Sequence, residues 1–191
     1  ECHQPLFKLI EEIADKGKNL ARDMYGLNGW AVHHNISIWR EAYPSDGFVY
    51  WFFWNMSGPW LCNHIWEHYL YTKDIDFLKK YYPILKGSAT FCSEWLVENS
   101  EGELVTPVST SPENAYLMPD GISASVCEGS TMDIAIIRSL FSNTINASKI
   151  LQTDSLFCAE LTQKVNKLKK YQIGSKGQLL EWDKEYMENE P

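Results

Sequence analysis

The stretch at residues 130–151, STMDIAIIRSLFSNTINASKIL, carries a clear helical pattern. Apolar side chains return every three or four residues, which is the spacing of one face of an α-helix. They are Met132, Ile136, Ile137, Leu140, Phe141, Ile145, Ala147 and Ile150. The pattern predicts a long amphipathic helix with one face in a core.

The same period predicts further helices over residues 5–24, about 59–71, 75–98 and about 155–171. The interior Pro83 predicts a kink or a break near Tyr82. Patterns typical of strands are nearly absent, and no fixed-period repeat is present. Short turns alternate with long loops, so we expect an all-α fold of helical hairpins whose long loops gather at one end.

Composition narrows the class of protein. The 191 residues are 45% apolar and 22% charged, which predicts a folded chain with a substantial core. A formal net charge of −8 argues against nucleic acid and anionic membranes as partners. The five cysteines are scattered without CxxC spacing, so buried free thiols are expected rather than a metal cluster or a disulfide framework.

A polar loop at residues 108–114, VSTSPEN, carries the strongest candidate for chemistry. Pro112 restricts Ser111 to an extended conformation, and Glu113 follows on a connection with no core to fill. We expect Glu113 to be catalytic. The alternative is an ordinary turn in which Ser111 caps a short helix and Glu113 complements the helix dipole.

An aromatic segment precedes this loop. Five tryptophans, which can bind the faces of sugar rings or fill a helical core, lie between residues 39 and 66: Trp39, Trp51, Trp54, Trp60 and Trp66. His33, His34 and Asn35 stand in the same irregular region and can converge on a ligand hydroxyl. The alternative is a loop pinned by its own side-chain hydrogen bonds.

A third pattern, His64-Ile65-Trp66-Glu67-His68, matches the inverted zinc-peptidase motif. Histidines at i and i+4 can face one metal, with Glu67 as base and Glu94 or Glu98 as a further ligand. Histidines hydrogen-bonded to their neighbours in the core or at its rim are the expected outcome, and we predict no metal and no cofactor.

Taken together, these motifs resemble the catalytic domain of glycoside hydrolase family 95, the inverting α-L-fucosidases that act mainly on α-1,2 linkages. The resemblance covers nearly all of the chain. It is carried, in order, by GWAVHHN at 29–35 with Trp39, GPWL at 58–61, WEHYL at 66–70, STSPEN at 109–114, TMD at 131–133, and QIG, GQ and EW at 172–174, 177–178 and 181–182.

The resemblance implies part of an (α/α)6 toroid, with residues 1–191 forming an incomplete catalytic domain cut at both ends. It implies that Glu113 is the general acid. The substrate-binding residues that it implies are His33, His34, Asn35, Trp39, Asn114, Glu181 and Trp182.

An inverting glycosidase also needs a base that activates water on the opposite face of the sugar. In the family this chain resembles, an asparagine polarised by an aspartate activates the water, and both are expected outside this chain. We therefore expect the isolated chain to be inactive. The expected partner is a fucosylated glycan, in a secreted or periplasmic location, with L-galactose as an open alternative to fucose. A non-catalytic, glycan-binding helical toroid is the alternative function.

Overall fold

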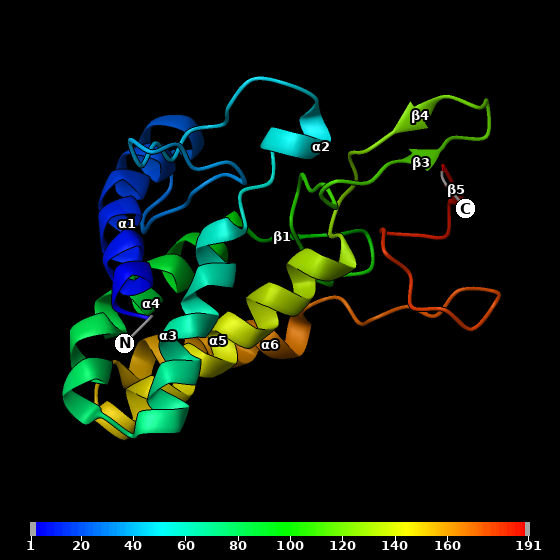
Figure 1. Cartoon of the computed structure of the whole chain (residues 1–191). Coiled ribbons are helices and arrows are strands. Elements are labelled where there is room, and N and C mark those ends of the chain that lie inside the picture. Colours follow the sequence, from blue (N-terminus) through cyan, green and yellow to red (C-terminus); the bar gives the residue numbers. More distant parts are fainter. Residues whose placement is uncertain (1–2, 190–191) are drawn as a thin grey trace.

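Two antiparallel helical hairpins form the centre of the molecule in the computed structural model, which describes residues 3–189 (Figure 1). The first hairpin joins α3 (Ser57–Thr72) to α4 (Ile75–Trp95). The second joins α5 (Thr131–Leu151) to α6 (Ser155–Lys167). Helix α5 packs against both α3 and α4, so the hairpins lie side by side. The prediction of an all-α fold built from helical hairpins is confirmed.

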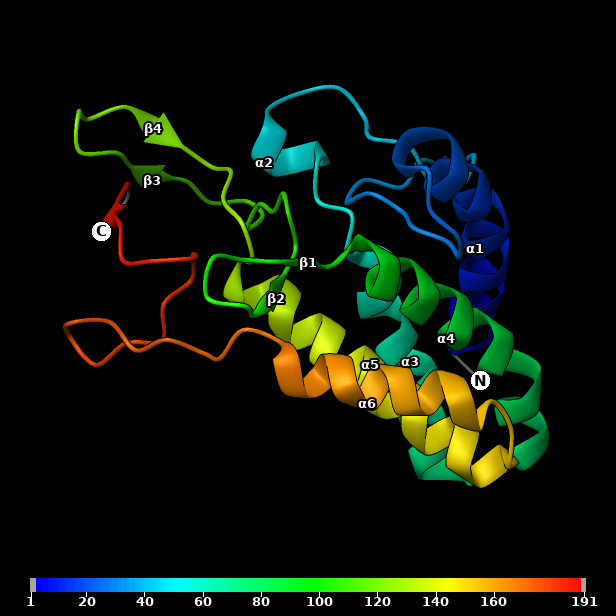
Figure 2. The ribbon, with the colours of Figure 1, turned by 180° about the vertical axis from the view of Figure 1, so that it is seen from behind.

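The connections differ at the two ends of these helices. At one end, only Lys73 and Asp74 separate α3 from α4, and residues 152–154 separate α5 from α6. At the other end lie residues 26–56 and residues 96–130, which are long and mostly irregular. Figures 1 and 2 show these long connections on the opposite side of the bundle from the short turns. The long loops gather at one end, as predicted.

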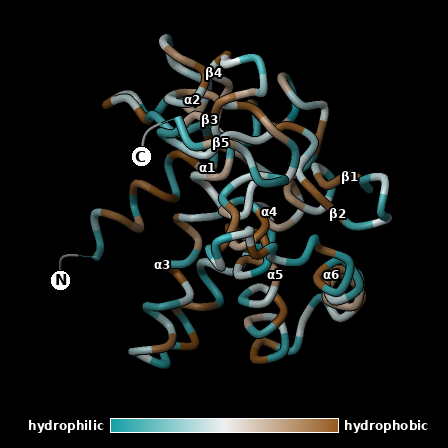
Figure 3. The backbone as a smooth tube through the Cα atoms, turned by 90° about the vertical axis from the view of Figure 1, so that its right-hand side faces the viewer, coloured by the Kyte–Doolittle hydropathy of each residue, from teal (hydrophilic) through white to brown (hydrophobic). Residues whose placement is uncertain are grey.

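Helix α1 (Gln4–Tyr25) leans on α3 and α4, and the short helix α2 (Val49–Phe52) lies inside the long connection that follows α1. Figure 3 shows hydrophobic and hydrophilic segments alternating along the helices, as expected when one face of each is buried. Asp74 caps the start of helix α4, because its carboxylate accepts hydrogen bonds from two backbone amides of the first turn, at 2.9 and 3.0 Å.

Trp30 fixes the spacing of the helices. Its side chain is 1% exposed, and its indole nitrogen donates to the carbonyl of Ile84 at 2.9 Å. A Cβ atom added at Gly58 would lie 2.6 Å from the indole ring, and one at Gly87 would lie 2.9 Å from it. Gly17 of α1 faces the same ring, with a Cβ distance of 3.2 Å. Three glycines from three helices therefore form the slot that holds this ring.

Small strands in the loops depart from the sequence expectation. Strands β1 (Val97–Glu98) and β2 (Leu104–Val105) pair with each other, and β3 (Tyr116–Leu117) pairs with both β4 (Ser123–Ala124) and β5 (Met187–Glu188), all antiparallel. The registers pair Val97 with Val105, Glu98 with Leu104, Tyr116 with Ala124 and Glu188, and Leu117 with Ser123 and Met187. Strands of two residues are too short to show an alternating pattern, which is why the sequence did not reveal them.

Two helix ends need correction, and of the kink or break expected near Tyr82 the break does not occur. Helix α4 continues through Pro83, because the ring lies on the exposed side, where water can satisfy the freed carbonyl, while Tyr82 and Leu85 pack in the core. Helix α4 ends at Trp95 rather than 98, because the chain enters β1. Helix α6 ends before Leu168, which forms a bridge to Leu104.

The cysteine prediction of buried free thiols is confirmed for Cys62, Cys92 and Cys158, whereas Cys127 is free but only partly buried. Burial raises the pKa of the Cys62 thiol to about 12. Cys2 lies outside the described residues. Within residues 3–189, no helix has both the length and the apolar character needed to cross a membrane.

Candidate active site

The loop that carries Glu113 is anchored at its base and open at its tip. We call residues 106–114 the Glu113 loop. Ser109 exchanges two backbone hydrogen bonds with Cys127, at 2.8 and 3.0 Å. The amide of Asn114 donates to the carbonyl of Ser111 at 2.7 Å, which closes a turn at Pro112 and Glu113 rather than the short helix of the alternative interpretation.

The Glu113 side chain lies on the exposed side of this turn. Within the described residues 3–189, its carboxyl group takes part in no hydrogen bond or ion pair. The three residues Ser109, Thr110 and Ser111 are buried, so the backbone that presents Glu113 is fixed while the carboxyl group faces outward. This arrangement suits a group that exchanges a proton with a ligand.

Beneath the loop lies a buried carboxylate that the sequence interpretation did not select as a site residue. Asp133, in the first turn of α5, is fully buried. One of its oxygens accepts from the indole nitrogen of Trp54 at 2.8 Å. The other accepts from the hydroxyls of Ser109 at 2.6 Å and Thr106 at 3.1 Å. Burial raises the pKa of Asp133 to about 6, and these hydrogen bonds act in the opposite direction.

The aromatic loop, residues 30–56, holds the histidine candidates in two different environments. His33 is fully buried, and burial lowers its pKa to about 4, so the ring is neutral near pH 7. Its Nδ1 lies 3.0 Å from the carbonyl oxygen of Phe52 and therefore donates, which leaves Nε2 to accept from the Tyr25 hydroxyl at 2.7 Å. Both ring nitrogens of His33 are therefore engaged within the protein.

His34 and Asn35 lie nearer the surface. The Nδ1 atom of His34 donates to the carbonyl of Trp51 at 2.6 Å, and Asn35 donates to the same carbonyl and to Ser45 Oγ, both at 3.2 Å. The His34 ring meets Trp54 edge-on, with ring centroids 5.9 Å apart. The Nε2 atom of His34 and the amide oxygen of Asn35 make no hydrogen bond within residues 3–189, which leaves them free for a ligand.

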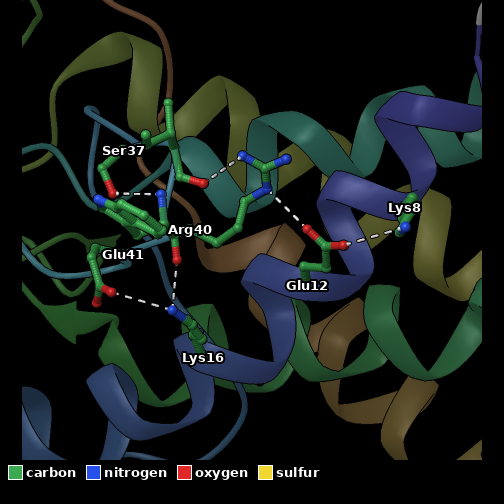
Figure 4. Close-up of polar contacts among 8 residues, drawn as sticks. Lys8, Glu12, Lys16, Ser37, Arg40 and Glu41 are labelled. Atoms are coloured by element: carbon green, nitrogen blue, oxygen red, sulfur yellow. Dashed lines mark hydrogen bonds and ion pairs between the residues drawn. The ribbon is translucent and has the colours of Figure 1, made fainter.

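Trp39 lies in a short segment, residues 37–41, whose Arg40 and Glu41 side chains form ion pairs with Glu12 and Lys16 of α1 (Figure 4). Its side chain is 71% exposed. Lys16 Nζ donates to its backbone carbonyl at 2.6 Å, and Arg40 Nε forms an ion pair with Glu12 at 2.9 Å. The indole ring is therefore open to solvent on a backbone that is held in place.

Glu181 reaches the Glu113 loop from the far end of the chain. Asn114 Nδ2 donates to the Glu181 carboxylate at 2.9 Å, and the Thr131 amide donates to the Glu181 carbonyl at 2.9 Å. Trp182 is buried, with its ring edge-on to Tyr116 at a centroid distance of 4.8 Å. Asn114, Glu181 and Trp182 line a cavity of about 180 Å³ beside the loop. The structure thus brings Asn114 and Glu181 together.

The histidines of the HxxEH motif lie in separate packing environments. His64 meets Trp60 edge-on at 5.1 Å, whereas His68 packs against Phe7 and Phe77, at 5.0 and 4.2 Å between ring centroids. The proposed further ligands are occupied elsewhere, because Glu94 binds Asn28 and Glu98 binds Lys167. In the part of the chain that the structure describes, no three His, Cys, Asp or Glu side chains are grouped as metal ligands. The geometry therefore does not support the zinc-peptidase alternative.

Trp54 and Asp133 are two residues of the candidate site that the sequence did not single out. Asp133 belongs to the quoted TMD motif, but an acidic residue in the first turn of a helix is ordinary, because it complements the helix dipole. Trp54 was one of five clustered tryptophans, and a sequence does not show which of them is buried. Only the three-dimensional contact between them shows that they join the two loops.

Comparison with known proteins agrees with the motifs. The profile of the glycosyl hydrolase family 95 catalytic domain matches residues 1–191. The chain is 40% identical over 192 residues to alpha-L-fucosidase 2 of Arabidopsis thaliana, covering 100% of this chain and 23% of that protein. It is 28% identical over 191 residues to probable alpha-fucosidase A of Aspergillus niger, covering 95% of this chain and 23% of that protein.

The chain thus spans about a quarter of the length of these curated relatives. The family profile covers all 191 residues, and the fold is built from helical hairpins. The chain therefore belongs to glycosyl hydrolase family 95, within its catalytic domain.

Proposed function

We propose that this chain is the acid-bearing part of an α-L-fucosidase that hydrolyses terminal α-L-fucosyl linkages, preferably α-1,2, with inversion of configuration. The observation that carries the proposal is Glu113, an exposed carboxyl group on a loop whose base is buried and bonded. Family membership and the names of the two relatives support fucose as the sugar. The substrate is a fucosylated oligosaccharide or glycan, and we propose a secreted or periplasmic location.

In this mechanism, Glu113 donates its proton to the glycosidic oxygen while the bond from that oxygen to the anomeric carbon breaks. A water molecule attacks the anomeric carbon from the opposite face and releases β-L-fucose. The groups that activate this water, an asparagine and an aspartate, are proposed to lie outside this chain. Proton donation of this kind contributes about 10²–10⁴-fold to the rate.

Substrate contacts are proposed on both sides of Glu113. His34, Asn35 and Trp39 form the side provided by the aromatic loop, since each presents an unengaged polar atom or an exposed ring. His33 belongs to the same side but orients it from beneath, because Tyr25 and Phe52 occupy its nitrogens.

Asn114 and Glu181 form the opposite side, close to the leaving group, with Trp182 packed behind them. Their mutual hydrogen bond keeps the Glu181 carboxylate next to the turn that carries Glu113. This carboxylate can accept a hydrogen bond from a sugar hydroxyl.

The decisive experiment measures fucose release from an α-1,2-fucosylated oligosaccharide by the full-length protein that carries this chain. Glu113→Gln should lower turnover by about 10²–10⁴-fold, since Gln cannot donate the proton. The matched control is Glu128→Gln, an exposed glutamate outside the proposed site, which should leave turnover unchanged. Full activity of the Glu113 variant would show that Glu113 is not the general acid.

Inversion is tested in the same preparation by ¹H NMR during the first minutes of the reaction. The β-anomer should appear first and the α-anomer only by mutarotation. Early α-anomer would show retention. Glycan binding without release by the wild type would instead favour the non-catalytic, glycan-binding toroid, and release of L-galactose in place of fucose would change the sugar.

A further inference from the structure

Asp133 makes more hydrogen bonds than an acidic residue in the first turn of a helix needs. The side chain of Ser130 already caps α5, because its oxygen accepts from the Asp133 amide at 3.3 Å. The Asp133 carboxylate instead points away from its own helix, toward Trp54 of the aromatic loop and toward Ser109 and Thr106 of the Glu113 loop. Each of its two oxygens serves a different loop.

A carboxylate in this position is expensive to bury. It forms no ion pair within residues 3–189 and depends on hydrogen bonds alone. An apolar residue of similar size could fill the space without the desolvation cost of a charge. The hydrogen bonds that tie this carboxylate to two loops are a reason to keep a charge here despite the desolvation cost. The indole of Trp54 can only donate, so its partner must be an acceptor such as a carboxylate oxygen.

Both ends of this bridge lead to the proposed site. Ser109 is the last anchored residue before the turn, with its backbone paired to Cys127, and Glu113 follows four residues later. On the other side, Trp54 packs against the ring of His34. The carboxylate therefore links the residue that would donate the proton to a residue that would hold the sugar.

We infer that Asp133 is a positioning residue that holds the Glu113 loop in register with Trp54 and the aromatic loop, so that Glu113 meets the glycosidic oxygen. This inference rests on the proposed function. Loss of the bridge displaces Glu113 relative to the sugar without removing the acid itself. A displacement of about 1 Å is enough to cost about 10²-fold in rate.

The test compares two fucosides in the full-length protein that carries this chain: an α-1,2-fucosylated disaccharide and α-L-fucosyl fluoride. The sugar leaving group needs a proton, whereas fluoride departs as an anion. Asp133→Ala should therefore behave as a weaker form of Glu113→Gln. Its kcat should fall by about 10²-fold on the disaccharide and by less than about fivefold on the fluoride, with KM for the disaccharide little changed.

Two further variants keep the test decisive if Asp133→Ala does not fold. Asp133→Asn should restore kcat to within about tenfold of wild type, because its amide oxygen can accept from Trp54 while its NH₂ group donates to the hydroxyls of Ser109 and Thr106. Ser109→Ala removes the shorter of the two bonds from the Glu113 loop to Asp133, together with the contact of the Ser109 hydroxyl with Ser130, and leaves the bond from Thr106. It should lower kcat about tenfold on the disaccharide and leave the fluoride rate unchanged. Thr144→Val, a buried hydroxyl of α5 that bonds only its own helix, is the control and should change neither rate.

Equal losses on both substrates, or no loss on either, would overturn the inference, since a purely structural role does not distinguish leaving groups. Failure of the proposed function gives a different result, because the wild type itself would then release no fucose from either substrate. If wild type and Glu113→Gln behave as proposed while the Asp133 and Ser109 variants do not, the inference alone is wrong.

Discussion

The aromatic loop and the Glu113 loop lie at the same end of the helices but are held in opposite ways. The aromatic loop is attached at many points: Trp30 fills a slot in the bundle, His33 bonds to Tyr25 and Phe52, and Arg40 pairs with Glu12. The Glu113 loop is held at its base by backbone hydrogen bonds at Thr106 and Ser109 and by one buried carboxylate, and at its end by the bond of Asn114 to Glu181, while the Glu113 side chain stays open. Recognition of a sugar can be shared among many contacts, whereas proton donation depends on the placement of a single group.

His33 of the aromatic loop and Asp133 beneath the Glu113 loop respond oppositely to pH. His33 is buried as a neutral base with a lowered pKa, and Asp133 is buried as an acid with a raised pKa. Lowering the pH therefore opposes the folded environment of His33 and favours that of Asp133.

The largest effect that tests the comparison is the removal of Trp30. Trp30→Ala leaves a cavity among three glycines that cannot fill it, and it should lower the free energy of unfolding by about 3–5 kcal/mol. If the aromatic loop is part of the bundle, the midpoints of urea unfolding measured by far-UV circular dichroism and by tryptophan fluorescence should shift together. Loss of the loop signal alone would show that the loop folds independently.

The next effect is the acid sensitivity of His33. Its stabilising contribution is fully present above its ordinary pKa of 6.5 and is lost as the pH falls through about 4. The difference between these two pKa values corresponds to about 3 kcal/mol of stability once His33 is fully titrated. The free energy of unfolding measured between pH 7 and 4 should fall less steeply in His33→Asn than in wild type. Parallel curves would show that His33 is not buried as the neutral form.

Asp133 should change the free energy of unfolding with pH in the opposite direction. Its raised folded pKa favours the folded state at low pH, and this contribution is lost as the pH rises through about 6. Relative to Asp133→Asn, the wild type should therefore lose up to about 3 kcal/mol between pH 4 and 7. Burial also raises the pKa values of the neighbouring thiols of Cys92 and Cys127, which stay protonated over this range. A wild type that gains stability relative to the variant on raising the pH would contradict this account.

The smallest of these effects concerns one hydrogen bond. Trp54→Phe keeps most of the ring but removes the donor to Asp133, so it should lower the free energy of unfolding by about 1.5–3 kcal/mol. In Asp133→Asn the same substitution should cost less, because the lost bond is no longer made to a charge. A double-mutant cycle from urea unfolding measures the difference, and additive effects would show that the two side chains do not interact.

Much of the fold could be predicted from the sequence, because it depends on local patterns. The apolar spacing of residues 130–151 predicted α5 within one residue at its start, and the long irregular segments predicted the loop end. Whether Pro83 would break the helix could not be decided from the sequence, because the effect of a proline depends on which side of the helix meets solvent. The two-residue strands depend on pairing with distant segments, as when Leu117 meets Met187.

The candidate site was predictable in part. Glu113 stood out because a carboxylate on a polar loop has no structural task, and the structure presents it in the open. The difference between His33 and His34 could not be predicted, since adjacent residues of one type look alike until one is buried. Trp54 and Asp133 are 79 positions apart, and nothing in the sequence indicates that they meet.

The slot around Trp30 sets an order of assembly. Its walls come from Gly17, Gly58 and Gly87, so the ring has no complete binding place until the chain has been synthesised as far as α4. Until then the ring and the glycines that will receive it remain exposed on the nascent chain. Helix α1, which precedes α3 and α4 in the sequence, can therefore settle only when α4 arrives, so the segment from α1 to α4 is expected to fold as one cooperative unit.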